Sequence, residues 1–322
     1  MSPGSRSAVD RIPAPALFIS SGLIQYVGAA VAIGLFAIMP ATAVGWWRMA
    51  ASALVLLAWR RPWRQRWTRG TLGAAVLFGV VLTTMNIGFY IAIDHLPLGT
   101  AVAIEFLGPV GVAAVGGRGW HDRLGIVLAA AGVLALTGVT LSGGGGRSVL
   151  IGLVAIFATA VMWAGYILLG RKVATGGDGV NSLAVGMTAG AIVYSPLAFG
   201  TTAIAIDDVR YLLALLVIAI ASSVIPYALE QQIMRRVTAA QFAIMLSLLP
   251  VTATLVGAVV LRQFPGVLDI LGVLVICVAI VLSARNPGVS DSLEAERVIA
   301  DRTDAHPDES KNGREPETPA AG

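Results

Sequence analysis

Charged residues are scarce in this chain. Only 12% of its 322 residues are Asp, Glu, Lys or Arg, whereas an ordinary soluble domain has about a quarter. Hydrophobic residues make up 57%, and the mean hydropathy is +0.82. This balance excludes an ordinary soluble domain. It predicts an all-α integral membrane protein that crosses the bilayer several times.

Cysteine and histidine are also nearly absent. The single cysteine, Cys277, lies inside an apolar run, which excludes an intrachain disulfide and a cysteine-based metal site. Its simplest interpretation is a small core residue. The three histidines, His95, His121 and His306, lie in loops or in the tail, and they form no Ser-His-Asp, HExxH or Cys/His pattern. We therefore expect no enzyme activity, no metal and no cofactor.

Long apolar runs dominate the chain. A membrane helix needs about 20 apolar residues, and the first such run, from residue 16, is too long for a signal-peptide core. Residues 1–15 form a polar N-terminal segment. The hydropathy pattern predicts ten spans: 16–38, 41–59, 71–93, 97–116, 123–141, 149–169, 181–200, 210–229, 238–261 and 266–284.

Basic residues indicate the orientation of these spans. A net charge of +4 suggests nucleic-acid binding in a soluble protein, but here the arginines lie between apolar runs and determine topology. With the N-terminus in the cytoplasm, Arg147, Arg210 and Arg262 lie on the outer side and Arg48 lies inside a span, while the other Lys and Arg lie on the inner side. We expect a multi-pass protein with both termini cytoplasmic and no bound nucleic acid.

The C-terminal segment differs in composition from the rest. Residues 285–322 are rich in acidic residues and poor in large apolar ones, so they predict a disordered cytoplasmic tail. Recruitment of a partner by this tail is an alternative.

The spans divide into two halves, residues 16–141 and 149–284. Leu107-Gly-Pro109-Val aligns with Leu248-Leu-Pro250-Val, which relates the fourth span to the ninth. Because each half holds an odd number of spans, the second half must be inverted relative to the first. Inverted repeats with matched helix breaks at Pro109 and Pro250 are typical of transporters with a site near the midplane. Ordinary proline kinks are the alternative.

Two charged residues lie inside predicted spans. Arg48 and Glu105 are each about 10 Å from the outer ends of their helices, at the usual rise of about 1.5 Å per residue. Intramembrane charges normally face the bundle interior and mark functional sites. We expect Glu105 to be a protonatable or amine-binding carboxylate and Arg48 to bind the carboxylate of a solute. A buried Arg–Glu pair that only stabilises two helices is the alternative.

Polar and aromatic residues also share helix faces. Asn86 and Tyr90 in the third span, and Trp163 and Tyr166 in the sixth, are candidates for contacting a substrate. The alternatives are a helix–helix hydrogen bond for Asn86 and an interfacial position for the aromatic residues.

A further candidate lies near the cytoplasmic end of the eighth span. There, Ser223, Tyr227 and Glu230 fall on one helix face, and Tyr227 and Glu230 form a candidate cytoplasmic gate. Pairing of Glu230 with Arg235 or Arg236 is the simpler interpretation.

The polar motifs of the chain resemble a known family. They are similar to the bacterial threonine/homoserine exporter type of the drug/metabolite transporter superfamily, built from EamA domains. The stretches that carry the resemblance are Gln25–Ala30, Met85–Pro109, Trp163–Gly170 and Ser222–Glu230. The resemblance implies ten helices in two EamA repeats, a bacterial inner-membrane location and export of small amino acids against proton entry.

The chain departs from this family in the ninth span. Such relatives commonly read Ser-Leu-Glu-Pro where this chain has Ser247-Leu-Leu249-Pro250, and Gly-Glu where it has Arg262-Gln263. Glu105 is thus expected to be the only acidic residue well inside the membrane.

The leading hypothesis is a proton-coupled, alternating-access exporter of threonine or homoserine. The alternatives are an exporter of another metabolite or drug on the same scaffold and a non-transporting membrane scaffold or sensor. The expected partners are the small-molecule substrate, protons and membrane lipid, and a homodimer is left open.

Overall fold

The computed structural model describes residues 12–116, 120–142, 144, 146–175, 179–226, 229, 233, 237 and 239–283. Helices account for the regular structure of these residues, and no strand occurs among them. This confirms the predicted all-α class. The terminal segments 1–11 and 284–322, with the expected tail, lie outside the described residues.

Five of the helices are long and apolar enough to cross a membrane. They are α1 (Ala14–Leu35), α2 (Ala41–Arg60), α3 (Arg69–His95), α6 (Trp120–Ser142) and α7 (Gly146–Thr175). Shorter helices follow or interrupt them: α4 (Leu98–Glu105), α5 (Leu107–Gly116), α8 (Gly179–Val193), α9 (Thr202–Asp207), α10 (Val209–Ala219), α12 (Ala239–Leu246), α13 (Leu248–Val259) and α14 (Val267–Ser283).

Local signals explain where several helices begin and end. Pro40 and Pro97 directly precede α2 and α4, where proline's fixed backbone angle suits a helix start. Thr68 begins α3 with a capping box, because its side chain accepts the Thr71 N–H and the Thr71 side chain accepts the Thr68 N–H. These starts fix the short loops at each end of the bundle.

The predicted fourth and ninth spans are each interrupted. The fourth is divided at Phe106 into α4 and α5, and the ninth at Ser247 into α12 and α13. Each interruption lies three residues before a proline, Pro109 or Pro250. Proline has no N–H for the carbonyl four residues earlier and clashes with it, so the regular helix cannot continue through either position.

Two other predicted spans also differ from the structure. The helix of the predicted span 181–200 ends at Val193, and a 3-10 turn, η3 (Ser195–Ala198), follows. Pro196 explains this end, because the residue before a proline is disfavoured in helical conformation. In the predicted span 210–229, α10 gives way to a π-helical turn, η4 (Ile220–Val224), whose C-cap N–H at Ile225 bonds to the Ile220 carbonyl.

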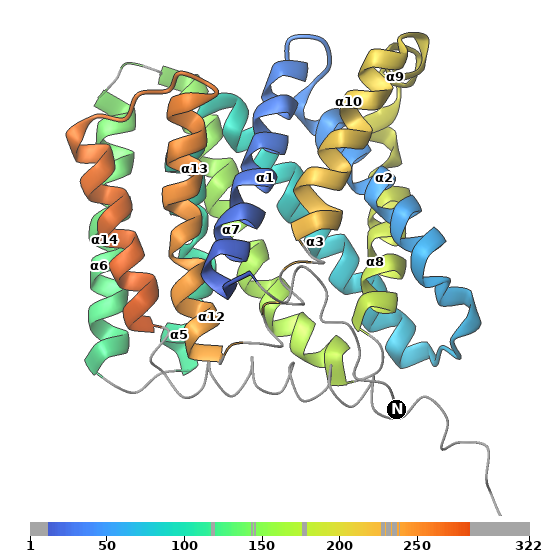
Figure 1. Cartoon of the computed structure of the whole chain (residues 1–322), viewed down its shortest axis with the longest axis horizontal. Helices are drawn as coiled ribbons and strands as arrows, with labels where there is room; N and C mark the ends of the chain where they lie inside the picture. The colour runs from blue at the N-terminus through green and yellow to red at the C-terminus, as the bar shows by residue number, and fades with distance from the viewer. Residues whose placement is uncertain are drawn as a thin grey trace, which may run out of the picture.

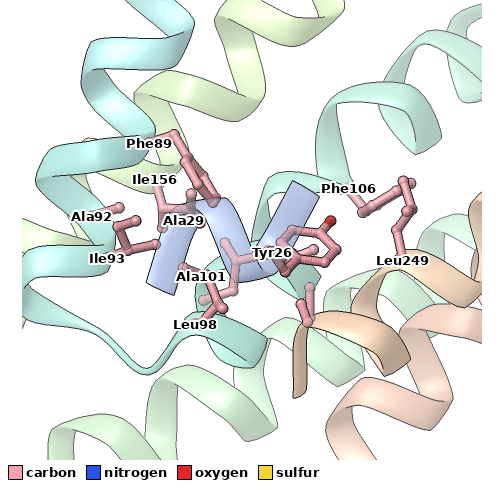
Figure 2. Packing of buried hydrophobic residues seen from close by; sticks show 14 of the residues in the cluster. Tyr26, Ala29, Phe89, Ala92, Ile93, Leu98, Ala101, Phe106, Ile156 and Leu249 are labelled. Atoms are coloured by element: carbon pink, nitrogen blue, oxygen red, sulfur yellow. The ribbon is translucent and has the colours of Figure 1, made fainter. Parts of the chain in front are cut away.

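The helices pack into one bundle (Figure 1). The start of α1 and the end of α14 lie at the same end of it, and the α1–α2 and α13–α14 loops lie at the opposite end (Figure 1). We call these the α1-start end and the α1–α2 loop end. In the main core, side chains from α1, α3, α4 and α7 meet (Figure 2), among them Tyr26, Phe89, Leu98 and Ile156.

The helix pairings connect the two halves of the chain. The most extensive contacts are those of α3 with α7 and α8, and of α6 with α14. In addition, α1 packs on α10, η4 and α13, while α2 packs on α8 and α10. Helices from both halves therefore contribute to a shared interior, and Arg48 and Glu105 belong to helices that line it.

Candidate functional site

Arg48 is buried in the interior and held by the π-helical turn. Its side chain is 7% exposed. Its Nε donates to the Ser223 hydroxyl at 3.1 Å, and its Nη2 donates to the Ser222 carbonyl at 2.5 Å. Buried charges need such partners, because an unpaired ion in an apolar environment is very costly. The contact fixes α2 against the eighth predicted span.

The local sequence explains why a carbonyl is available to Arg48. Pro226 lies four residues after Ser222 and carries no N–H, so it cannot provide the usual helical donor for the Ser222 carbonyl. The π-helical turn Ile220–Val224 further shifts the backbone pattern at this position. Such turns often occur at functional sites. The guanidinium thus bonds to a carbonyl for which Pro226 offers no N–H.

The same turn is also linked to α1. The Ser222 hydroxyl donates to the Gln25 carbonyl at 3.0 Å, and the Ser52 hydroxyl donates to the Arg48 carbonyl at 2.8 Å. The Arg48 region therefore connects α1, α2 and η4 through hydrogen bonds between buried groups.

Tyr90 lies beside Arg48. Its ring is fully buried, and the Arg48 Cζ is 5.5 Å from the ring centroid, within the range of a cation–π contact. The Tyr90 hydroxyl faces Arg48 and Ser222, yet it reaches hydrogen-bond geometry with no described residue. The site thus contains a buried hydroxyl without a hydrogen bond to a described residue.

Glu105 ends α4 at the interruption before Pro109. Its side chain is half-buried, and Arg48 is the charged group that interacts with it electrostatically. Among the described residues, the only close ion pair is Arg210 with Asp208, so Arg48 and Glu105 do not form the direct salt bridge considered as an alternative. Arg48 binds the π-helical turn instead, because a carbonyl and a hydroxyl are already placed there.

The residues around Glu105 are apolar. Phe106 is 1% exposed, and its ring meets that of Trp163 edge-on at 4.8 Å. Leu249, from α13, is also buried and belongs with Phe106 to the main core (Figure 2). Trp163 therefore contacts Phe106, the residue that follows the candidate carboxylate Glu105 in the chain. Leu249 is uncharged, so it adds no charge to this region.

Asn86 and Tyr166 lie in different surroundings. Asn86 is buried, but its amide nitrogen donates to the carbonyl of Leu82 in its own helix at 2.8 Å instead of forming the helix–helix hydrogen bond considered as an alternative. Tyr166 stacks on Phe78, with ring centroids 4.7 Å apart, in a second core cluster separate from that of Trp163. The structure thus brings Trp163 toward Glu105 and directs Tyr166 elsewhere.

The sequence did not identify every polar partner of the site. Tyr227, Glu230, Arg235 and Arg236, on which the candidate gate depends, lie outside the described residues. The role of the Ser222 carbonyl was missed. The adjacent Ser222 and Ser223, followed by Pro226 in an apolar span, are the signal that could have indicated it.

Comparisons with known proteins indicate the family and the fold of the chain. Residues 150–285 match the EamA-like transporter family. A crystal structure of a protein that is 18% identical matches with a TM-score of 0.51 over 90% of this chain and 99% of that one, which shows a shared fold.

Two relatives are more similar in sequence. The threonine/homoserine exporters RhtA of Salmonella typhimurium (strain LT2) and of Escherichia coli (strain K12) are each 32% identical over 260 residues. The match covers 80% of this chain and 87% of each relative. Together with the apolar helices and the buried polar site, these findings show that the chain belongs to the EamA-like transporter family.

Proposed function

We propose that the protein is a secondary active exporter of small amino acids such as threonine or homoserine, coupled to proton entry. The observation that carries the proposal is the Glu105 carboxylate, which lies at a helix interruption without a salt bridge to a described residue. Intramembrane carboxylates in such positions commonly belong to proton or substrate pathways. The RhtA relatives support the choice of substrate.

The site suits a zwitterionic solute. Two N–H groups of Arg48 are used by Ser222 and Ser223, and the remaining guanidinium donors can bind a carboxylate. Glu105, in its ionised form, attracts an ammonium group. The free hydroxyl of Tyr90 adds a neutral hydrogen-bonding group beside Arg48. Proton binding at Glu105 would remove the attraction for the amine, which provides a route to proton coupling.

The helix pairings support ten spans in two inverted repeats. If α1–α6 correspond to α7–α14, then the pairs α3–α7, α3–α8 and α5–α7 correspond to α10–α1, α10–α2 and α13–α1, and all of these pack together. The shorter apolar helices, including Asn181–Val193 and Val267–Leu282, would complete the set of spans. The matched interruptions at Phe106 and Ser247 fit the same correspondence.

One pair does not follow the correspondence, and it supports alternating access. Helix α4 packs on α13, whereas the matched pair, α5 and α12, makes no comparable contact within the described residues. Among the described residues, the divided spans therefore contact each other more at the α1–α2 loop end than at the α1-start end. Inverted repeats that differ in this way are expected when one side of a transporter is closed.

The basic residues support an orientation with both termini in the cytoplasm of a bacterial inner membrane. In that orientation, the α1-start end would face inward, which is consistent with a state that loads cargo from the cytoplasm. Protons, membrane lipid and the amino acid are the proposed partners.

Replacement of Glu105 tests the proposal. In proteoliposomes, Glu105→Gln preserves the shape of the side chain but removes its charge and proton exchange. We expect it to reduce flux of labelled threonine or homoserine driven by a pH gradient to background. Asp94→Asn is the matched control, because Asp94 is an exposed carboxylate at the end of α3.

Two results would decide against the proposal. If a pH gradient drove flux through the Glu105→Gln variant at the wild-type rate, the proposed role of Glu105 would be contradicted. Absence of flux for both amino acids in the wild-type protein, with flux of an unrelated metabolite, would favour the other substrate class on the same scaffold.

A further inference from the structure

The segment between α2 and α3 is the most strongly basic exposed part of the described chain. We define it as the basic loop, Arg61–Arg69, which includes the short 3-10 turn η2 (Pro62–Arg64). Its arginines at positions 61, 64, 66 and 69 are all exposed. No acidic residue occurs from Trp59 to Arg69, and none of the four arginines forms an ion pair with a described residue.

The basic loop has a defined conformation. The Trp67 Nε1 donates to the Pro62 carbonyl at 3.0 Å, which closes the turn. The Asn181 Nδ2 donates to the Gln65 Oε1 at 2.8 Å, which attaches the loop to α8. Helix α8 itself contains no charged residue. The four guanidinium groups are therefore presented on a fixed support, without a carboxylate from the helix beneath them.

Aromatic side chains border these arginines. Trp59 is 60% exposed and Trp63 is 63% exposed. Tryptophan is enriched at the boundary between hydrocarbon and headgroups. The loop connects two membrane helices at the α1-start end of the bundle (Figure 1), so we expect its tryptophans and arginines at the level where phospholipid headgroups begin.

We propose that the basic loop binds the headgroups of anionic phospholipids. Phosphate groups fit the planar, bidentate donors of arginine, and juxtamembrane basic clusters attract anionic lipids. Charge complementarity and the exposed indole rings favour a lipid surface over a soluble anion. The basic loop is placed to do more than set topology. It contacts α8, and it joins α2, which carries Arg48, to α3, which carries Tyr90.

Fluorescence quenching by brominated lipids tests this assignment without any need for transport. The full-length protein is reconstituted in vesicles that contain a constant fraction of anionic phospholipid, with bromine on either the anionic or the zwitterionic component. The contribution of Trp63 is obtained as the difference from Trp63→Phe. At equal bromine content, we expect the anionic component to quench Trp63 about twofold more strongly, because the surface attracts that lipid.

Charge variants identify the source of the preference. In the double variant Arg64→Gln/Arg66→Gln, Trp63 should be quenched equally by both components. Arg147→Gln should retain the preference, because exposed Arg147 lies next to Ser148, which bonds to His95 at the end of α3 away from the basic loop. Native-like thermal unfolding of each variant excludes misfolding as the cause. Added inorganic phosphate should not remove the preference at constant ionic strength.

Two outcomes would overturn the proposal. Equal quenching of Trp63 by both components, in the wild-type protein and also after deletion of residues 291–322, would mean that the arginines only set topology. A preference that emerges only after deletion of the acidic residues 291–322 would identify that segment as the occupant of the loop in the full chain.

Discussion

Tyr90 carries a polar group that the fold does not need. Its hydroxyl is buried without a hydrogen-bond partner among the described residues, although its ring contacts Arg48. Tyr90→Phe removes only the hydroxyl. We expect the free energy of unfolding to change by less than about 0.5 kcal/mol, since no hydrogen bond within the protein is lost. The KM for the exported amino acid should rise about tenfold, which corresponds to one lost hydrogen bond to substrate.

Thermal unfolding and flux measurements on the same preparation check this expectation. Tyr90→Leu is the contrasting variant, because it also removes the buried ring and should destabilise the protein by about 3 kcal/mol. An unchanged KM for Tyr90→Phe would exclude a substrate contact by the hydroxyl.

The residues of the site differ in how far the sequence could reveal them. Arg48 and Glu105 were identifiable because a charge in an apolar run is rare and costly. Their partners were not, since Ser223 is 175 positions from Arg48 along the chain and Ser222 is 174. Hydropathy shows that burying a charged side chain costs free energy. It does not specify which distant backbone carbonyl accepts the hydrogen bond of that side chain.

At the scale of helices, Pro226 offers no N–H to the Ser222 carbonyl, which accepts a hydrogen bond from Arg48. Pro226→Ala restores an N–H that competes for that carbonyl. We expect weaker anchoring of Arg48 and an increase of about tenfold in KM, because a hydrogen bond to a charged group contributes about 1.5–3 kcal/mol. The KM is measured from the flux at a series of substrate concentrations.

Pro196→Ala is the control for that substitution. Pro196 occupies the first turn of η3, where a missing N–H has little consequence, so its replacement should leave KM near the wild-type value. Equal effects of the two substitutions would indicate a general response of the bundle to loss of a proline.

The crossing of α3 and α8 depends on Gly79. A Cβ at this position would overlap the Gly186 carbonyl in the facing helix. Gly79→Ala must separate the helices, and we expect destabilisation of about 1–3 kcal/mol, as for other overpacked sites. Gly73→Ala, on the same helix, is the matched control, since a Cβ there meets nothing. Thermal unfolding is measured in detergent. Equal midpoints for Gly79→Ala and Gly73→Ala would contradict the close contact between α3 and α8.

The limits of prediction at this scale follow from the same physics. The long spans were predictable, and the observed α3, Arg69–His95, contains the predicted 71–93. The interruptions at Phe106 and Ser247 were indicated by Pro109 and Pro250, but apolar content alone gave continuous spans. The π-helical turn at Ile220–Val224 was not predictable, because an apolar composition fits either helical pattern.

At the scale of the whole molecule, Gln263 connects the two halves at the α1–α2 loop end. Its Oε1 accepts the Leu98 N–H at 3.0 Å, at the start of α4, and a Cβ at Gly99 would overlap Thr254 in α13. Gln263→Leu removes this bond. One hydrogen bond contributes about 1 kcal/mol, so opening at this end should become about fivefold more frequent.

Cysteine labelling measures that opening. In a Cys277→Ser background, Thr254→Cys should react about fivefold faster with a membrane-impermeant maleimide when Gln263→Leu is present. Arg147→Cys is an exposed control whose rate should not change. Equal rates at position 254 with and without Gln263→Leu would show that the bond does not hold this end closed.

The unpaired carboxylate of Glu105 has an electrical consequence. The aspartates of the described residues lie in first or last helix turns or in loops: Asp94, Asp122, Asp207, Asp208 and Asp269. With Leu246 at the position that matches Glu105 in the other repeat, the proposed cycle carries one proton inward for each zwitterion exported, and therefore one net positive charge. Voltage contributes about 2.3 kcal/mol per charge at 100 mV. Export would then continue on membrane potential alone after the pH difference has collapsed.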